Sequence, residues 1–181
     1  ISAGQSHMIN LAIRVDTSGR NEIVLASEFA NEASKSIGLL SVLRSGDDPV
    51  QPWTVKEIDR LTTSHRLRWA DLEGDGKKVV VNAPLTGAKA TPPDYKDVAP
   101  LVFYRPGEWK RQQIESTNEG VQHGIFIVDW DGKGRDAILS ASFSGIHLFR
   151  RQTDNGFSRT ELSKQNSSDV TVGHLGKERF L

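Results

Sequence analysis

Short apolar runs of four to seven residues, bounded by Gly, Asp or Ser, follow one another along most of this chain. The clearest group lies in 123–150, where an acidic, glycine-containing turn and a Ser-Gly pair separate runs at 123–128, 137–143 and 146–150. Runs of this length that are rich in Ile, Val, Leu and Phe are typical of antiparallel strands. The pattern therefore predicts an all-β protein without a helix of ordinary length.

The same arrangement recurs along the chain. Asp16, Asp71 and Asp129 each follow the first strand of a unit, with spacings of 55 and 58 residues. A repeat of this length with four short strands is typical of a β-propeller blade, which buries its faces only against neighbouring blades. The predicted blades span 9–60, 65–116, 123–164 and, for the start of a fourth, 169–181.

Three blades and a fraction cannot close a ring, so we expect a β-propeller segment from a larger propeller of about six to eight blades. Trp53, Trp109 and Phe157 open the predicted fourth strands and are expected to pack between blades. A strand is also predicted at 169–175, opening the fourth unit. Expressed alone, the segment is expected to be marginally stable or to aggregate, because open blade faces expose apolar surface.

Composition narrows the choice of partners. The chain has 181 residues with 23 basic and 23 acidic side chains, so its formal net charge is zero. This balance favours neither nucleic acid nor a membrane as a partner, and no apolar run approaches the roughly 20 residues of a membrane span. The absence of cysteine excludes disulfides and thiolate catalysis. We expect a soluble protein, cytoplasmic or secreted, and the start without Met indicates a processed product or a piece of a longer protein.

Two acidic turns are candidate metal sites. Asp71, Glu73 and Asp75 form one, and Asp129 and Asp131 form the other, each interleaved with Gly. Alternate carboxylates around a glycine turn are the oxygen ligands that hard cations such as Ca²⁺ or Mg²⁺ prefer. The alternative is a turn held by hydrogen bonds between Asp side chains and the backbone, without metal.

Three histidines recur with the blades. His7, His65 and His123 are spaced 58 residues apart, and each precedes the first strand of its unit. Adjacent blades would therefore present imidazoles at one rim of the central channel. Such a group suits a divalent metal such as zinc, with His7, His65 and His123 as ligands, or a catalytic base and acid supplied by His65 and His123. The alternative is that each imidazole bonds a neighbouring blade and repeats because the blade repeats.

The longest irregular segment, 84–100, joins the second and third strands of the second predicted blade. Asp94, Tyr95 and Lys96 give it polar and aromatic tips, and it is expected to overhang the same rim as the histidines. Long loops in such places often bind ligands, so these three residues are candidate substrate contacts. A solvent-exposed insertion is the other interpretation.

The turn between first and second strands, D-x-D-G-x-G, resembles the FG-GAP (VCBS-type) repeats of integrin-like and microbial β-propellers. A narrower resemblance rests on SHRLRWADLEGDGKKVVVNAPLTG, DYKDVAPLVFYRPGEWKR, VQHGIFIVDWDGKGRDAILSASFSGIHLFRR and VTVGHLGKERFL. These segments resemble the propeller of the fungal aldos-2-ulose dehydratase (1,5-anhydrofructose dehydratase) type. The resemblance implies a seven-bladed propeller joined to further domains, in a lyase that needs a divalent metal ion.

Three functions remain open from the sequence. The first is a sugar lyase that dehydrates an aldos-2-ulose or anhydrofructose-type substrate, abstracting a proton next to a carbonyl with a metal to polarise it. The second is a non-catalytic propeller that binds a carbohydrate or a protein. The third is a structural spacer within a larger chain. Fold alone does not decide among these functions. In each case the remaining blades and domains of the same chain are expected partners.

Overall fold

The computed structural model describes residues 9–176 and 178–181 and confirms the predicted all-β class. It contains three four-stranded antiparallel sheets and a two-stranded hairpin. Each sheet is a meander of four consecutive strands, and we call the three sheets blades 1, 2 and 3 in chain order. Among the described residues, the helical structure is one short 3-10 turn, η1 (Ala33–Lys35). Closure of such blades into a ring stays a prediction.

Blade 1 consists of β1 (Asn10–Val15), β2 (Asn21–Ser27), β3 (Leu39–Arg44) and β4 (Thr54–Arg60). Blade 2 consists of β5 (Ser64–Ala70), β6 (Val79–Pro84), β7 (Leu101–Tyr104) and β8 (Arg111–Glu115). Blade 3 consists of β9 (Gln122–Val128), β10 (Ala137–Ser142), β11 (Gly145–Arg151) and β12 (Phe157–Ser163). The hairpin pairs β13 (Gly173–Leu175) with β14 (Glu178–Phe180).

The burial of each strand follows from its place in the blade. The second strands β6 and β10 are buried along their whole length, which is why they read as continuous apolar runs rather than alternating ones. The fourth strand β4 is mostly exposed, and its sequence is accordingly polar. Each fourth strand also departs from regular register against its neighbour, so the same irregularity recurs in all three blades.

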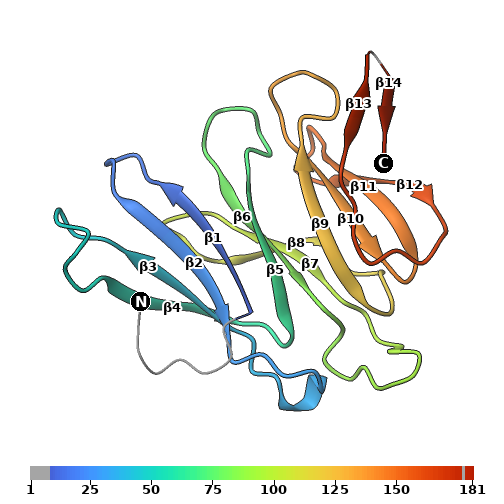
Figure 1. Cartoon of the computed structure of the whole chain (residues 1–181), viewed down its shortest axis with the longest axis horizontal. Helices are drawn as coiled ribbons and strands as arrows, with labels where there is room; N and C mark the ends of the chain where they lie inside the picture. The colour runs from blue at the N-terminus through green and yellow to red at the C-terminus, as the bar shows by residue number, and fades with distance from the viewer. Residues whose placement is uncertain (1–8, 177) are drawn as a thin grey trace.

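The blades pack face to face, with β1 beside β5 and β5 beside β9 (Figure 1). Trp109 fills the core between blades 1 and 2, and Phe157 packs against the core between blades 2 and 3, as expected. Trp53 packs instead on the outer face of blade 1, against Ile23, Leu25 and Leu43. These cores show the two-sided burial by neighbours that repeat architectures require.

Two predictions about strands need correction. Trp109 does not open the fourth strand of blade 2, because it has a left-handed φ of 52° and β8 begins only at Arg111. The strand predicted at 169–175 covers only Gly173–Leu175. Val170 and Val172 belong to the core against blade 3, so their apolar side chains reflect packing rather than strand pairing.

The connections divide between two ends of the blades (Figure 1). The β1–β2, β5–β6 and β9–β10 turns lie at one end, which we call the turn end. The η1 segment and the long β6–β7 loop lie at the other, which we call the rim end. In the described part of the chain, no helix is long and apolar enough to cross a membrane.

Candidate functional site

His65 and His123 occupy the same irregular position at the rim end of two neighbouring blades. In β5 the register against β6 shifts between Ser64 and Arg66, so His65 is the extra residue. In β9 the register against β10 shifts between Gln122 and Gly124, which makes His123 the extra residue there. Such bulges re-aim a side chain relative to the regular pleat, and they recur beside active sites. The local backbone thus presents both imidazoles in the same way.

The two imidazole rings lie next to each other across the seam between blades 2 and 3. Their centroids are 5.0 Å apart with planes tilted by 47°. The ring of Phe29, which follows β2 in blade 1, lies 5.6 Å from the ring of His65. The structure therefore brings together one ring from each blade, and Phe29 was not anticipated from the sequence. Its position at the end of the predicted second strand was the one sequence feature that could have placed it at the rim end.

His65 is a neutral, buried imidazole near neutral pH. Its side chain is 6% exposed, and its Nδ1 is buried without a hydrogen-bond partner among the described residues. Burial, together with the positive charge of Arg66 and the neighbouring His123, lowers the pKa of His65 to about 4. An imidazole in this state carries no proton to give up as an acid at neutral pH.

His123 is oriented by the backbone that leads into the fourth unit. Its Nδ1 lies 2.8 Å from the carbonyl oxygen of Ser168. A carbonyl only accepts, so Nδ1 carries the proton in this bond and the neutral ring keeps its free lone pair on Nε2. The Nε of Arg66 donates to the backbone carbonyl of His123 at 3.1 Å, which places a guanidinium beside the pair.

The other histidines lie elsewhere or have other tasks. His7 lies outside the described residues, so its predicted role as a third member stays a prediction. His147 is buried, and its Nε2 accepts a hydrogen bond from Arg159 at 2.8 Å. Burial first, and then the charge of Arg159, lower the pKa of His147. This arrangement is that of a neutral structural residue in β11.

The 84–100 loop is rooted beside the histidines. Thr63 donates its hydroxyl to the Thr86 carbonyl at 2.7 Å, and the Gln122 amide donates to the Leu85 carbonyl at the same distance. These bonds join the start of the loop to residues that lie two positions before His65 and one before His123. The loop thus leaves from the rim end, where it was expected.

The candidate substrate contacts in this loop have partners of their own. The ring of Tyr95 packs edge-on against Phe143 in the β10–β11 turn, at a centroid distance of 6.4 Å. Asp94 and Lys96 are exposed and form an ion pair with each other at 3.4 Å. The structure brings Tyr95 to blade 3 but reveals no contact between these three residues and the imidazoles. Their role in binding stays a prediction.

The acidic turns fold around their first aspartate. Asp71 accepts backbone hydrogen bonds from Gly74 and Gly76, both at 2.8 Å. Asp129 accepts the corresponding bond from Gly134 at 2.8 Å, and this bond is the main cause of the lowered pKa of Asp129. This is the geometry of a turn held by side-chain-to-backbone bonds, which was the alternative to a metal loop.

The remaining carboxylates of these turns face cations. Glu73 bonds Arg105 at 3.1 Å and Arg151 at 3.0 Å, and Asp75 pairs with the lysine two positions later at 3.3 Å. Asp131 lies 4.0 Å from an arginine of β11. Within residues 9–176 and 178–181, no three His, Asp or Glu side chains converge as ligands of a metal ion. The described residues thus do not by themselves form a complete set of metal ligands, and metal binding stays a prediction.

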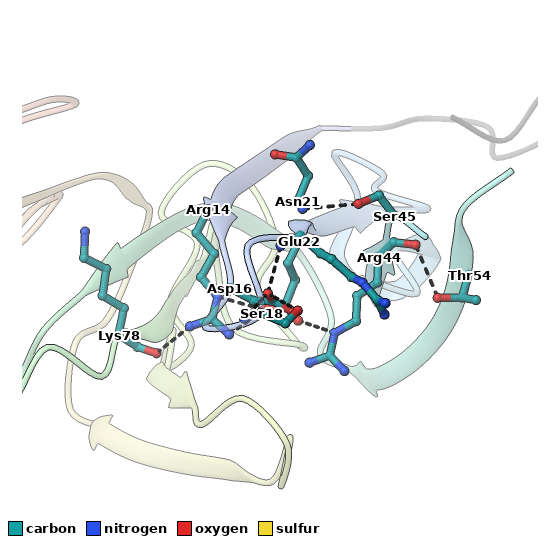
Figure 2. A network of polar contacts seen from close by, with 10 residues as sticks. Arg14, Asp16, Ser18, Asn21, Glu22, Arg44, Ser45, Thr54 and Lys78 are labelled. Carbon is teal, nitrogen blue, oxygen red and sulfur yellow. Dashed lines mark hydrogen bonds and ion pairs between the residues drawn. The ribbon is translucent and has the colours of Figure 1, made fainter. Parts of the chain in front are cut away.

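A second polar site, which the sequence reasoning missed, lies at the turn end between blades 1 and 2. There Arg14 and Arg44 flank the carboxylate of Glu22, which is fully buried (Figure 2). Arg14 lies 2.7 Å from Glu22 and 4.3 Å above the ring of Trp69, and Arg44 bonds the other carboxylate oxygen. The signal was present in the sequence, since Glu22 is a charge at the start of an otherwise apolar strand.

A cavity of about 850 Å³ opens beside this site. Its walls include residues of both blades, among them Asp16, Arg44, Trp69, Lys78, Arg105 and Glu108.

Comparisons with known proteins do not identify a family for this chain. No family model matches this sequence. No curated protein matches it either. The three packed four-stranded sheets support propeller-like blades, and the resemblance to FG-GAP repeats and to the dehydratase propeller stays a prediction.

Proposed function

We propose that this chain supplies part of the catalytic rim of a propeller enzyme that dehydrates a sugar derivative, with His123 as the base. The observation that carries the proposal is the hydrogen bond from His123 Nδ1 to the Ser168 carbonyl. A ring held in this way has a defined tautomer, with Nε2 as the nitrogen that accepts a proton. The same logic orients the base in established catalytic pairs and triads.

The reaction is a carbon–oxygen elimination in which one imidazole moves one proton. His123 takes the proton from the carbon next to a carbonyl, and the electrons of that bond pass to the carbonyl oxygen to give an enolate. The carbonyl then re-forms, and a double bond forms between the deprotonated carbon and the next carbon of the sugar. The hydroxyl group on that next carbon is expelled. That hydroxyl takes the proton back from the imidazolium and leaves as water, so atoms and charge balance.

The neighbours of His123 suit this task. The guanidinium of Arg66, which bonds the His123 backbone, supplies positive charge near the developing enolate. His65, neutral because its pKa is lowered to about 4, does not compete for the proton. Phe29, whose ring lies 5.6 Å from that of His65, is half-buried and offers an aromatic surface that suits the apolar face of a sugar. A divalent metal is not used in this account, because the described donors do not converge on one.

A non-catalytic carbohydrate-binding propeller is the second candidate. It is favoured by the ring of Phe29 at the rim, which suits contact with the apolar face of a sugar and requires no proton transfer. On this alternative, the ring surface at the rim holds the sugar without turning it over.

The decisive experiment follows proton exchange in the complete protein. An anhydrofructose-type 2-ketose is incubated in D₂O, and loss of the proton next to the carbonyl is monitored by NMR. We expect exchange and elimination to fall by about 10²–10⁴-fold in His123→Gln, because a general base contributes that much. His174→Gln is the matched control, since His174 is an exposed residue of β13.

Full activity of His123→Gln would show that this imidazole is not the base. Saturable sugar binding without exchange in the unmodified protein would instead establish the binding propeller.

A further inference from the structure

The cavity between blades 1 and 2 lies at the turn end, away from the rim that carries the histidines. It is lined by the turns of both blades: 16–17 from blade 1, and 76–79 with 105–108 from blade 2. Five lining residues are basic and two are acidic; they are Arg14, Arg44, Lys77, Lys78 and Arg105 against Asp16 and Glu108. A cavity of this size with an excess of cations in its wall is a candidate ligand site in its own right.

The polar cluster beside the cavity stands where blade 2 has a pair of apolar side chains. Arg14 pairs in register with Glu22 next to the β1–β2 turn. The corresponding pair in blade 2 is Ala70 with Val79, and both are buried. A buried ion cluster at such a place is seldom more stabilising than apolar packing of similar volume. Stability alone therefore does not account for the charges in blade 1.

The next seam contains a carboxylate at the equivalent level. In the β5–β6 turn of blade 2, Glu73 accepts hydrogen bonds from Arg105 and from Arg151 of blade 3. Arg44 and Arg105 occupy equivalent positions of blades 1 and 2. Arg44 follows Leu43, which pairs with Ile23 of β2. Arg105 follows Tyr104, which pairs with Val80 of β6. The seam between blades 2 and 3 thus shows what an arginine in this position binds: a carboxylate oxygen.

The β1–β2 turn of blade 1 has no carboxylate at the position of Glu73. This turn has five residues, 16–20, against eight in 71–78, and Thr17 and Ser18 stand where Leu72 and Glu73 follow the first aspartate. Asp16 itself accepts hydrogen bonds from Ser18 and from the Arg20 amide. Its carboxylate is therefore committed to its own turn.

Arg44 keeps capacity for a ligand. Its side chain is 43% exposed, and among the described residues Glu22 engages only its Nε through a side-chain bond. Arg14 and Arg44 both pair with the single carboxylate of Glu22 (Figure 2), and basic side chains outnumber acidic ones in the cavity wall. The buried Glu22 holds both guanidinium groups in place, so little side-chain entropy is lost when an anion binds.

We propose that this cavity binds a small oxyanion, a carboxylate or a phosphate group of a ligand, through the guanidinium of Arg44. The bound group takes the place that Glu73 takes in the next seam. Arg14 supports the site through Glu22 and Trp69 and is a positioning residue. The site is independent of the proposed rim chemistry, because it lies at the other end of the blades.

Isothermal titration calorimetry of the complete protein with sodium phosphate and with sodium acetate, at constant ionic strength, tests the proposal. We expect saturable binding of one anion per chain. Arg44→Gln should weaken it about tenfold or more, because a charge-assisted pair of bonds is lost. Lys56→Gln, which removes an exposed lysine of β4 outside the cavity, should leave binding unchanged.

A second variant covers the case in which Arg44→Gln fails to fold. Ser18→Glu supplies an internal carboxylate in the turn and should abolish binding of the added anion while the fold is retained, as measured by circular dichroism. Binding of phosphate alone identifies a phosphorylated ligand, binding of acetate alone a carboxylate, and binding of both a general oxyanion site. No saturable binding of either probe, or equal weakening by Arg44→Gln and Lys56→Gln, would overturn the proposal.

Discussion

At the scale of single residues, the two rim histidines show how one repeated position acquires two chemical states. Both are the extra residue of a β-bulge, and their rings lie 5.0 Å apart. His123 donates to the Ser168 carbonyl, whereas the Nδ1 of His65 is buried without a partner among the described residues. The hydrogen bond defines the tautomer of one ring, and burial keeps the other neutral.

The lowered pKa of His65 makes stability depend on pH. The unfolded chain binds a proton to this imidazole below its ordinary pKa of 6.5, whereas the folded protein does so only near pH 4. The unfolded state therefore holds more protons between these values, so the free energy of unfolding is fully retained above pH 6.5 and falls as the pH drops toward 4. We expect His65→Phe to reduce this loss, measured as the difference between urea midpoints at pH 7 and pH 5.

His174→Phe, at an exposed position of β13, is the control and should keep the pH dependence of the unmodified protein. An unchanged difference between the two pH values in His65→Phe would contradict the assignment of a buried neutral imidazole.

At the scale of elements, an exposed edge strand is tied to the next blade by one carboxylate. Asp59 of β4 accepts a hydrogen bond from the Tyr104 hydroxyl at 2.6 Å and two from Arg111, both at 2.7 Å. Burial opposes ionisation of Asp59, but the bonds from Arg111 and Tyr104 outweigh it and lower its pKa. Burial and the same bond raise the pKa of Tyr104. The clamp thus joins β4 of blade 1 to β7 and β8 of blade 2.

Removal of the tyrosine hydroxyl should weaken this clamp. We expect Tyr104→Phe to lower the free energy of unfolding by about 1.5–3 kcal/mol, the usual worth of a hydrogen bond to a charged group. Tyr95→Phe is the control, because the Tyr95 ring packs on Phe143 through its edge and should be insensitive to loss of the hydroxyl. Urea unfolding measures both variants, and equal effects would show that the Asp59 bond contributes nothing specific.

At the scale of the whole molecule, the outer face of blade 1 presents exposed apolar side chains. Ile13 is 59% exposed and Leu11 is 42% exposed. Register places Ile13 opposite Ile23 and Trp69 opposite Val80, so Ile13 and Trp69 are equivalent positions of neighbouring blades. Trp69 packs against the core that blade 1 helps to build. The face of blade 1 has the same apolar character without a neighbouring sheet.

Because Ile13 is exposed and Trp69 is packed, we expect substitution by Lys to have different effects at these two equivalent positions. Ile13→Lys should reduce self-association of the chain and change the free energy of unfolding by no more than about 0.5 kcal/mol, as surface substitutions do. Trp69→Lys should destabilise the fold by about 3 kcal/mol or more, because it opens a packed core. Analytical ultracentrifugation and urea unfolding measure the two effects. Unchanged self-association of Ile13→Lys would show that this face is not adhesive.

Much of the architecture followed from the sequence, because strand periodicity and turn residues are local. The spacing of Asp16, Asp71 and Asp129 predicted three repeated units, and the structure contains three four-stranded antiparallel sheets. The run at 169–175 misled because Val170 and Val172 are apolar for packing against blade 3, and an apolar run alone does not distinguish pairing from packing. Trp109 likewise belongs to the turn before β8, where its backbone is left-handed, although its ring packs in the core between blades.

The candidate sites depended far more on tertiary structure. The sequence placed His65 and His123 at equivalent points, but only the packed blades set their ring separation, the Ser168 bond and the burial that lowers one pKa. The Arg14–Glu22–Arg44 cluster joins strands that are local in sequence, yet its cavity exists only because blade 2 packs against blade 1. Local pattern determined which side chains recur, and contacts between distant segments decided their charge states and the surfaces they share.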